Sequence, residues 1–259
     1  MPERSAAADA PRDLTEDRLL GGRVAVRQPR RGHRAGSDAI LLAASVPAVA
    51  GERAIDLGAG VGTAGLALHA RAGARVLLVE IDPALAGLAV ENVDLNRAGA
   101  DVMALIGDAA TLRPEAAAGF APADHVLANP PFNPPTGRRP PDPRTARARV
   151  AEADTLDAWA RTAARLLRPG GSFTMICRAD GVAAALASFE SRFGGLALRF
   201  VHGREGEPAV RLLIGGWRGS RAPLRVLPPL VLNGADGRLT AMAEAIHRDA
   251  EPLPLLAAA

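Results

Sequence analysis

Two short segments of the sequence carry groups that could bind a ligand or take part in chemistry. The first is the glycine-rich run Asp56-Leu57-Gly58-Ala59-Gly60-Val61-Gly62-Thr63, which follows an apolar stretch. Glycines let a backbone turn tightly and approach a ligand closely, and a helix that starts after them adds positive potential. Asp56 would repel a pyrophosphate but would pair well with an amino-bearing ligand. This segment therefore predicts a site for a small molecule with a cationic group.

A dinucleotide is the competing interpretation of the same glycines. A GxGxxG spacing runs through Gly60, Gly62 and Gly65, which would suggest a dinucleotide fingerprint. Two features count against it. The glycines start directly after the apolar run, at Gly58, which gives GxGxG, and an acid precedes them.

The second segment is Asn129-Pro130-Pro131-Phe132, which follows the apolar run HVLA. The amino nitrogen of a nucleobase or a glutamine amide is a poor nucleophile because its lone pair is conjugated. The side-chain oxygen of Asn129 and the carbonyl of Pro130 are two acceptors that can orient such a nitrogen, and prolines add no competing donor. Phe132 offers a flat face for stacking a flipped-out base. The segment therefore predicts a holder for a planar amino group.

The surrounding pattern predicts the elements that position these segments. Apolar runs alternate with helical patterns, which predicts an α/β fold with a parallel, doubly wound sheet and helices on both faces. The predicted strands are 53–57, 75–80, 102–106, 125–128 and 172–177, and the predicted helices are 63–72, 83–97, 155–168 and 181–193. Residues 196–202 and 209–217 are joined by a short turn, which predicts an antiparallel pair at the end of the sheet.

Residues outside this alternation give further expectations. Residues 18–28 predict a short hairpin or an extended pair around Gly21-Gly22, and Ser37 and Asp38 predict the N-cap of a helix. Asp82 is expected to cap the helix that starts at Pro83. The segment 133–150 has five prolines and five arginines and is predicted to be a long loop.

The glycine run and its spacing to later acids resemble the class I S-adenosylmethionine-dependent methyltransferases. The resemblance implies a Rossmann-like sheet of seven strands, parallel with an antiparallel terminal hairpin, and S-adenosylmethionine as the cofactor. It implies that Glu80 binds the ribose hydroxyls, that Ile81 flanks the adenine and that Asp108 and Ala109 contact it. The implied cofactor site comprises Asp56, Gly58, Ala59, Gly60, Glu80, Ile81, Asp108, Ala109 and Asn129. The sulfonium is an activated donor, so positioning supplies much of the rate and no metal is required.

Asn129–Phe132 resembles the (D/N/S)PP(Y/F) motif of methyltransferases that act on planar amino nitrogens, which implies catalytic roles for Asn129, Pro130, Pro131 and Phe132. The run from Gln28 through Gly32-His33-Arg34 to Ala43, and the tail from Arg221 to Ile246, resemble the bacterial tRNA-valine (adenine-37-N6)-methyltransferases. That resemblance implies an adenine in RNA, at tRNA position 37, as the acceptor. A glutamine-N5 protein methyltransferase, an rRNA guanine-N2 methyltransferase and a non-catalytic RNA- or cofactor-binding module stay open as alternatives.

Length and composition suit one large domain with short appendages: 259 residues, 48% hydrophobic and 23% charged. We expect a disordered N-terminus over 1–14, a hairpin and helix lead-in over 15–51, a methyltransferase core over 52–220 and a C-terminal extension packed on the core over 221–259. Without a stretch of about 20 apolar residues or a secretory signal, we expect no membrane association and a cytoplasmic protein. The single cysteine, Cys177, excludes an intrachain disulfide, and its role stays open, as does the oligomeric state.

All 31 basic Lys or Arg residues are arginines, at a net charge of +3. Arginine binds phosphates in bidentate fashion, which is compatible with an RNA partner. Candidate RNA-binding side chains are Arg30 and Arg34 in the lead-in and Arg138 and Arg139 beyond the predicted base pocket, with Arg31, Arg144, Arg147 and Arg149 close to them. The five histidines are scattered, so the sequence predicts no metal site.

Overall fold

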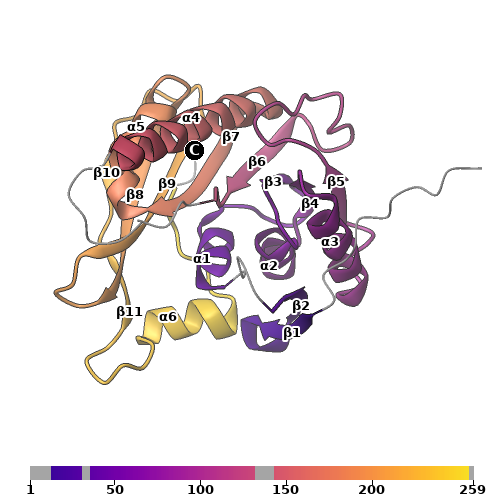
Figure 1. Ribbon diagram of the computed structural model, residues 1–259, viewed down its shortest axis with the longest axis horizontal. Helices are drawn as coiled ribbons and strands as arrows, with labels where there is room; N and C mark the ends of the chain where they lie inside the picture. Colours follow the sequence, from indigo (N-terminus) through magenta and orange to yellow (C-terminus); the bar gives the residue numbers. More distant parts are fainter. Residues whose placement is uncertain (1–12, 31–35, 132–142, 257–259) are drawn as a thin grey trace, which may run out of the picture.

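The computed structural model describes residues 13–30, 36–131 and 143–256, with the backbone alone over 143–152. Seven strands form the central sheet, in the order β8-β9-β7-β6-β3-β4-β5 (Figure 1). They are β3 (Arg53–Leu57), β4 (Arg75–Glu80), β5 (Val102–Ile106), β6 (Ala123–Ala128), β7 (Leu167–Arg178), β8 (Phe193–Arg204) and β9 (Ala209–Arg218). β9 runs antiparallel to β7 and β8, and the other neighbours are parallel. The predicted parallel sheet with a terminal antiparallel pair is confirmed.

Two short strands extend this sheet beyond the predicted seven. β10 (Arg225–Val226) and β11 (Leu230–Asn233) both pair in parallel with β8, which makes nine strands in the described part of the sheet. The segment after β11 returns to the helices, where the N–H of Leu253 donates to the carbonyl of Ala44. Arg199 on β8 donates to the carbonyls of Pro228, between β10 and β11, and of Pro254, after β11, so one side chain holds two parts of the C-terminal region.

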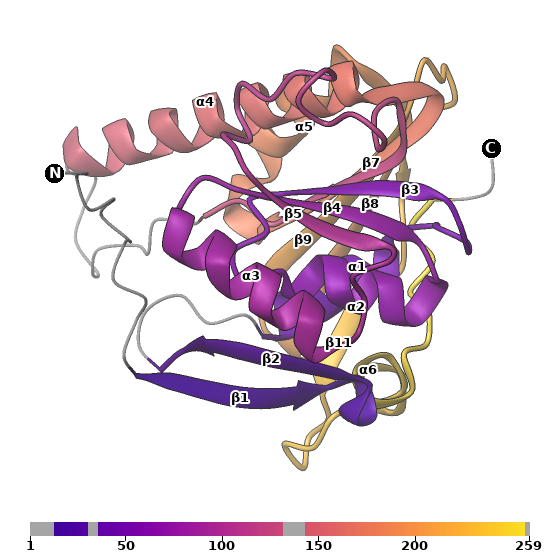
Figure 2. The ribbon, with the colours of Figure 1, turned by 90° about the vertical axis from the view of Figure 1, so that its right-hand side faces the viewer.

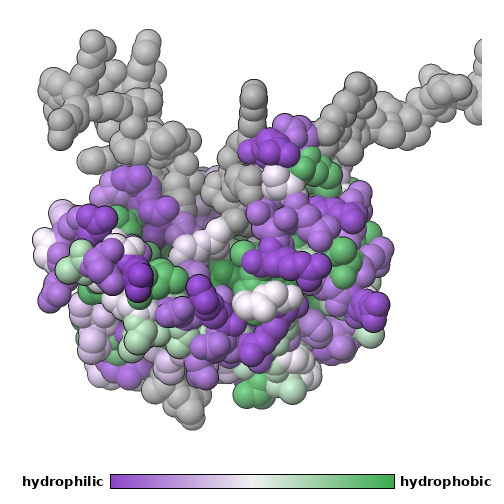
Figure 3. Space-filling view, turned by 90° about the horizontal axis from the view of Figure 1, so that it is seen from below, coloured by the Kyte–Doolittle hydropathy of each residue, from purple (hydrophilic) through white to green (hydrophobic). Residues whose placement is uncertain are grey.

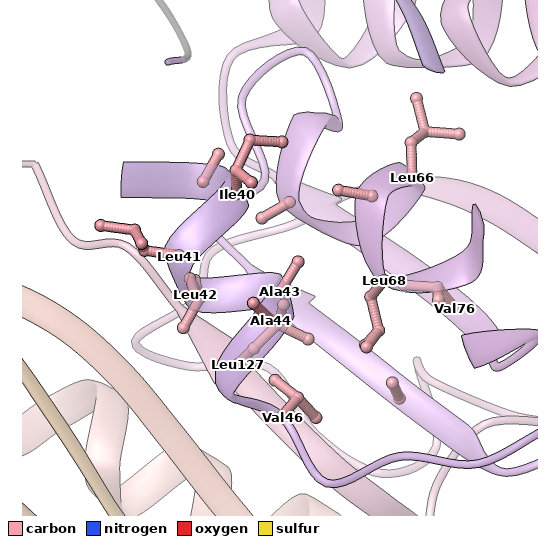
Figure 4. Close-up of a cluster of buried hydrophobic side chains, with 14 of the residues drawn as sticks. Ile40, Leu41, Leu42, Ala43, Ala44, Val46, Leu66, Leu68, Val76 and Leu127 are labelled. Carbon is pink, nitrogen blue, oxygen red and sulfur yellow. The ribbon is translucent and has the colours of Figure 1, made fainter. Parts of the chain in front are cut away.

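Helices cover both faces of the sheet, as predicted (Figure 2). One face carries α1 (Ser37–Ser45), α2 (Thr63–Ala72) and α3 (Pro83–Leu95), and the other carries α4 (Pro143–Leu166) and α5 (Val182–Glu190). Each face has its own buried apolar cluster. In the first cluster, leucines of α1 and α2 meet Val76 and Leu127 of the sheet (Figure 4). Burying a leucine or valine side chain contributes roughly 1.5–3 kcal/mol, so the two clusters hold the three layers together.

The N-terminal hairpin forms a further layer outside the first helices (Figure 2). β1 (Leu14–Leu19) and β2 (Val24–Pro29) are joined by the short helix η1 (Leu20–Gly22), as the Gly21-Gly22 turn predicts. The side chains of Asn92 on α3 and of Asn96, directly after its end, exchange hydrogen bonds with the backbone of Arg27 and Ala25 on β2. These bonds pair the outer edge of β2 with side-chain amides and fix the hairpin to the core.

The surface that carries the hairpin also carries α6 (Ala241–Glu244) and the π-helix η3 (Ala245–Asp249). Seen from that side, most exposed side chains are hydrophilic, and apolar ones form small groups between them (Figure 3). No helix among the described residues is long and apolar enough to cross a membrane. The division of the chain into a lead-in, a core and an extension stays a prediction.

Two predicted boundaries differ in the structure. α4 begins at Pro143, so residues 143–150 are helical where a loop was predicted. The prolines of 133–150 end at Pro143, which suits a first helical turn, and the Ala, Arg and Glu that follow favour a helix. α4 ends at Leu166, where β7 begins, so Pro169-Gly170-Gly171 lies within the start of β7 and not at the predicted helix end.

The predicted cap of α1 was wrong as well. Gly36 occupies the N-cap position, and no side chain caps the helix. Asp38 pairs instead with Arg211 on β9, at 2.8 Å, and the hydroxyl of Ser37 lies 2.7 Å from Nε2 of His247. The side chains that looked like local caps therefore make long-range contacts. Asp82 does cap α3, because its Oδ1 accepts from the N–H groups of Ala84 and Leu85.

Candidate functional site

The glycine loop lies between the end of β3 and the start of α2. Gly58 has φ +70°, a conformation that side chains disfavour, and a Cβ there would lie 2.4 Å from Cη2 of Trp159. Trp159 lies on α4 and is 8% exposed. Only glycine satisfies both the backbone and the packing at this position, so the loop and the indole fit against each other.

Glu80, at the end of β4, is held by two backbone donors. Its Oε2 accepts from the N–H of Gly60 at 2.8 Å, and its Oε1 accepts from the N–H of Asp82 at 2.9 Å. Each carboxylate oxygen retains a further lone pair. A rigidly held carboxylate with free acceptor capacity suits a ligand with two hydroxyl donors.

Asp108 follows β5 and organises the next loop. Its Oδ1 accepts from the N–H of Ala110, and its Oδ2 accepts from the hydroxyl of Thr111. The hydroxyl of Thr162 on α4 donates to the carbonyl of Ala110 at 2.7 Å. This bond attaches the loop to the same helix that carries Trp159, so α4 supports the site at two points.

Asn129 follows β6, and β6 pairs with β3 so that Ala128 lies opposite Leu57. Asn129 is therefore one residue beyond that pair, as is Gly58 on the neighbouring strand. Oδ1 of Asn129 is buried and has no hydrogen-bond partner among the described residues. Buried polar atoms are almost always paired, so this acceptor is set up for a donor that comes from a ligand.

These segments enclose one pocket at the carboxyl ends of β3, β4, β5 and β6, with a volume of about 290 Å³. Ligands of open α/β sheets bind at this edge. The pocket brings together every residue of the predicted cofactor site and one proline of the motif: Asp56, Gly58, Ala59, Gly60, Glu80, Ile81, Asp108, Ala109, Asn129 and Pro131. Pro130 is buried next to it, and Phe132 lies outside the described residues.

Other residues of the lining were not predicted from the sequence. They include Ala39 of α1, Thr63 and Ala64 of α2, Leu85 of α3 and Trp159 of α4. Thr63 follows the glycines directly, so its position in the sequence could have indicated it. Trp159 carries no such signal, because a buried aromatic in a helix is the ordinary pattern of a core.

Asp56 is the most strongly perturbed acid of the pocket. It is 1% exposed, and its carboxylate accepts from the N–H of Gly65 at 2.9 Å. Burial, with a smaller contribution from the charge of Glu80, raises the pKa of Asp56 to about 7, against the lowering effect of the Gly65 bond. The charge of this carboxylate therefore changes near neutral pH.

The predicted RNA-binding arginines are only partly within the described residues. Arg30 follows β2, and its Nε lies 2.8 Å from Oδ1 of Asp13. Arg34, Arg138 and Arg139 lie outside the described residues, and so does Arg31. Arg144, Arg147 and Arg149 are on the first turns of α4, for which the backbone alone is described.

No group of three or more His, Cys, Asp or Glu residues among the described residues could hold a metal ion. His125 is buried at the amino end of the sheet, between the hydroxyl of Ser172 and the carboxylate of Glu52. A larger hollow of about 580 Å³ lies beside Trp217, and no predicted site residue and no carboxylate lines it.

Comparison with known families gives a match over most of the chain. The family model described as methyltransferase small domain matches residues 34–197. A tRNA1(Val) (adenine(37)-N6)-methyltransferase of Dickeya chrysanthemi is 28% identical over 86% of this chain and 90% of its own length. The protein of the same name from Phocaeicola vulgatus is 29% identical over 73% of this chain and 79% of its own length.

Two solved structures of methyltransferases are also similar to the chain. A predicted O-methyltransferase from Agrobacterium tumefaciens superposes with a TM-score of 0.69 at 31% identity, over 84% of this chain and 98% of that one. A 16S rRNA N2 G1207 methyltransferase of Thermus thermophilus, solved with AdoMet and guanosine, has a TM-score of 0.54 at 25% identity. That match covers 79% of this chain and 50% of the Thermus chain.

Proposed function

Because the chain belongs to the methyltransferase small domain family and is an S-adenosylmethionine-dependent methyltransferase, we propose that its acceptor is the N6 amino group of an adenine in RNA. We propose tRNA, at position 37, as that RNA. The relatives with this printed activity support the proposal, since they align over most of both chains.

The observation that carries the proposal is the unpartnered Oδ1 of Asn129. An N6 amino group has two hydrogens and needs two acceptors. The Asn129 oxygen takes one hydrogen and the Pro130 carbonyl the other, which orients the nitrogen lone pair. Pro131 keeps competing donors away, because proline has no N–H. Phe132 stacks on the flipped-out base.

The pocket fits the cofactor. The close packing of Gly58 on Trp159 and the doubly held carboxylate of Glu80, which has free acceptor capacity for two hydroxyl groups, support an adenosyl ligand. Glu80 binds the ribose hydroxyls, Ile81 and Ala109 flank the adenine, and Asp108 orders the loop around it. When bound, S-adenosylmethionine supplies an electrophilic methyl group on a sulfonium. The protein contributes position and the exclusion of water, and no strong base is needed.

RNA binding is proposed to use arginines of the lead-in and of the segment that follows the motif in the sequence. Arg30, Arg34, Arg138 and Arg139 would contact phosphates on either side of the target base. The first turns of α4 carry Arg144, Arg147 and Arg149, which follow the motif in the sequence and are further candidates. Phosphate contacts hold the RNA in register and make binding salt-dependent.

A transfer assay tests the acceptor. The chain is incubated with methyl-labelled S-adenosylmethionine and, separately, with total tRNA, rRNA and a release factor. We expect label in tRNA, recovered as N6-methyladenosine by nucleoside mass spectrometry. Label in rRNA as N2-methylguanosine would instead support the guanine-N2 alternative, which the Thermus neighbour favours. Label in the release factor would support a glutamine-N5 activity.

A further inference from the structure

The hydroxyl of Thr63 is a buried polar group without a hydrogen-bond partner in the part of the chain that the structure describes. Thr63 is the first residue of α2 and is 1% exposed. Its Oγ1 has no hydrogen-bond partner among the described residues, and the residue lines the cofactor pocket. Buried hydroxyls almost always make a hydrogen bond, and a ligand in the pocket can provide the missing partner.

The start of α2 adds backbone donors beside this hydroxyl. The N–H of Gly65 is taken by Asp56, and the N–H of Leu66 by the carbonyl of Gly62. The N–H groups of the first helical residues, Thr63 and Ala64, have no partner within a helix. Both residues line the pocket. The helix terminus carries partial positive charge and favours an anion.

The charges of the pocket restrict where an anion can bind. Three carboxylates line it, those of Asp56, Glu80 and Asp108, and no arginine or histidine is among its described lining residues. A ligand carboxylate must therefore avoid these acids and find neutral donors. The start of α2 is the part of the lining that offers an O–H and N–H groups together.

We propose that the hydroxyl of Thr63, with the amino end of α2, binds the carboxylate of the cofactor's methionine part. This deepens the proposed function and rests on the use of S-adenosylmethionine, but not on the identity of the RNA acceptor. The assignment divides the cofactor by chemistry. Glu80 takes the ribose hydroxyls, Asp56 the ammonium group, and Thr63 the anionic end.

Binding measurements on the full chain without RNA test this assignment. S-adenosylhomocysteine and 5′-methylthioadenosine are titrated calorimetrically into the wild type and Thr63→Val. The second ligand has the adenosine and thioether but lacks the amino-acid end. Because a hydrogen bond to a charged group is lost, we expect Thr63→Val to weaken S-adenosylhomocysteine binding about 10- to 100-fold. Binding of 5′-methylthioadenosine should change by less than about twofold.

Two variants make the test specific. Thr63→Ser keeps the hydroxyl and should bind both ligands almost as the wild type does. Thr174→Val is the matched control, because Thr174 on β7 also has a buried, unpartnered hydroxyl but does not line the pocket. It should leave both affinities unchanged. Without ligand, Thr63→Val should melt at or above the wild-type temperature, since it removes an unpaired buried hydroxyl.

If Thr63→Val weakened the affinity for both ligands equally, the proposal would be overturned, because Thr63 would then contact the nucleoside part that the two ligands share. Unchanged binding of S-adenosylhomocysteine would overturn it too. If Thr63→Val does not fold, Thr63→Ala provides the same ligand comparison. None of these outcomes depends on RNA methylation, so they are independent of the tRNA assay.

Discussion

The N–H of Gly60 donates a hydrogen bond of 2.8 Å to Oε2 of Glu80, which ties the glycine loop after β3 to the end of β4. A second bond, from the N–H of Asp82, holds the other carboxylate oxygen. The acid that is proposed to bind the ribose is thereby fixed before any ligand arrives. Preorganisation of this kind lowers the cost of binding.

Glu80→Gln should weaken binding of S-adenosylhomocysteine by about tenfold or more. A glutamine presents an NH₂ group to one of the two backbone donors, so one hydrogen bond becomes a donor–donor contact. Isothermal titration calorimetry measures the effect. Glu91→Gln, on the exposed surface of α3, is the control and should bind as the wild type does. Equal affinities for wild type and Glu80→Gln would exclude Glu80 from the ribose site.

Gly58→Ala should destabilise the fold by about 2 to 4 kcal/mol, because the new Cβ meets Trp159 and the residue has φ +70°. Urea unfolding followed by circular dichroism gives the change in free energy. Gly87→Ala is the matched control in α3, where a Cβ meets nothing within 4 Å. It should be neutral or stabilising by up to about 1 kcal/mol. Similar losses in both variants would contradict the Gly58–Trp159 packing.

The affinity for S-adenosylmethionine should rise between pH 6 and pH 8. The pKa of Asp56 is about 7, so its carboxylate gains charge over this range and pairs better with the ligand ammonium. Asp56→Asn should bind more weakly, with an affinity that changes little over the same range. Calorimetry at several pH values measures this, and an equally steep pH dependence in Asp56→Asn would assign the titration to another group.

Without ligand, the effect of Asp56 on the stability of the fold decreases with rising pH, whereas its effect on ligand affinity increases. Its pKa is higher in the folded chain than the ordinary value of 3.8, so the folded state binds more protons between these values. Its contribution to stability is complete below pH 3.8 and is lost as the pH rises toward 7. At pH 8, ligand-free Asp56→Asn should therefore melt at a higher temperature than the wild type.

His125 should make the fold less stable in mild acid. Burial lowers its pKa below 6.5, against the opposing effects of Glu52 and Asp124, and Arg168 lowers it further. Below pH 6.5 this histidine is protonated in the unfolded chain but stays neutral in the folded chain. The unfolding free energy therefore decreases as the pH is lowered, by up to about 1.4 kcal/mol per pH unit. Urea titrations at pH 5, 6 and 7 should show a smaller slope in His125→Asn. His202→Asn, at the β8–β9 turn, is the control.

Arg138→Gln and Arg139→Gln should weaken tRNA binding and reduce its salt dependence. Each lost phosphate contact lowers the slope of log K against log salt concentration by about 0.7 to 0.9. Filter binding at several salt concentrations gives the slope. Arg225→Gln on β10, beside β8 and away from the pocket, is the control. Unchanged slopes in the first two variants would remove these arginines from the RNA-binding surface.

The sequence predicts the sheet and the pocket well because both depend on local patterns. Each predicted strand from 53 to 217 lies within a strand of the structure, and the residues after four strand ends meet where a parallel sheet requires it. Trp159 escaped prediction because its role depends on the crossing of α4 over the glycine loop. Pro143 misled the prediction, because a proline count over a window cannot distinguish a first-turn proline from a loop proline.

Ser37 and Asp38 also show that a local sequence pattern does not determine the partners of a side chain. A serine and an aspartate before an apolar run are typical of a helix cap, yet their partners are His247 and Arg211. Those partners lie more than 170 positions away along the chain. Whether a polar side chain binds a local or a distant partner depends on the three-dimensional fold.

Trp159 gives the molecule an internal optical reporter. The chain has two tryptophans, Trp159 at the pocket and Trp217 at the far end of β9. Replacing Trp217 by phenylalanine would leave a single indole, against the glycine loop. Trp159 lies well inside α4, beyond its first turns, and its indole lines the pocket. The emission of that indole would thus register ligand arrival in the pocket without an added dye.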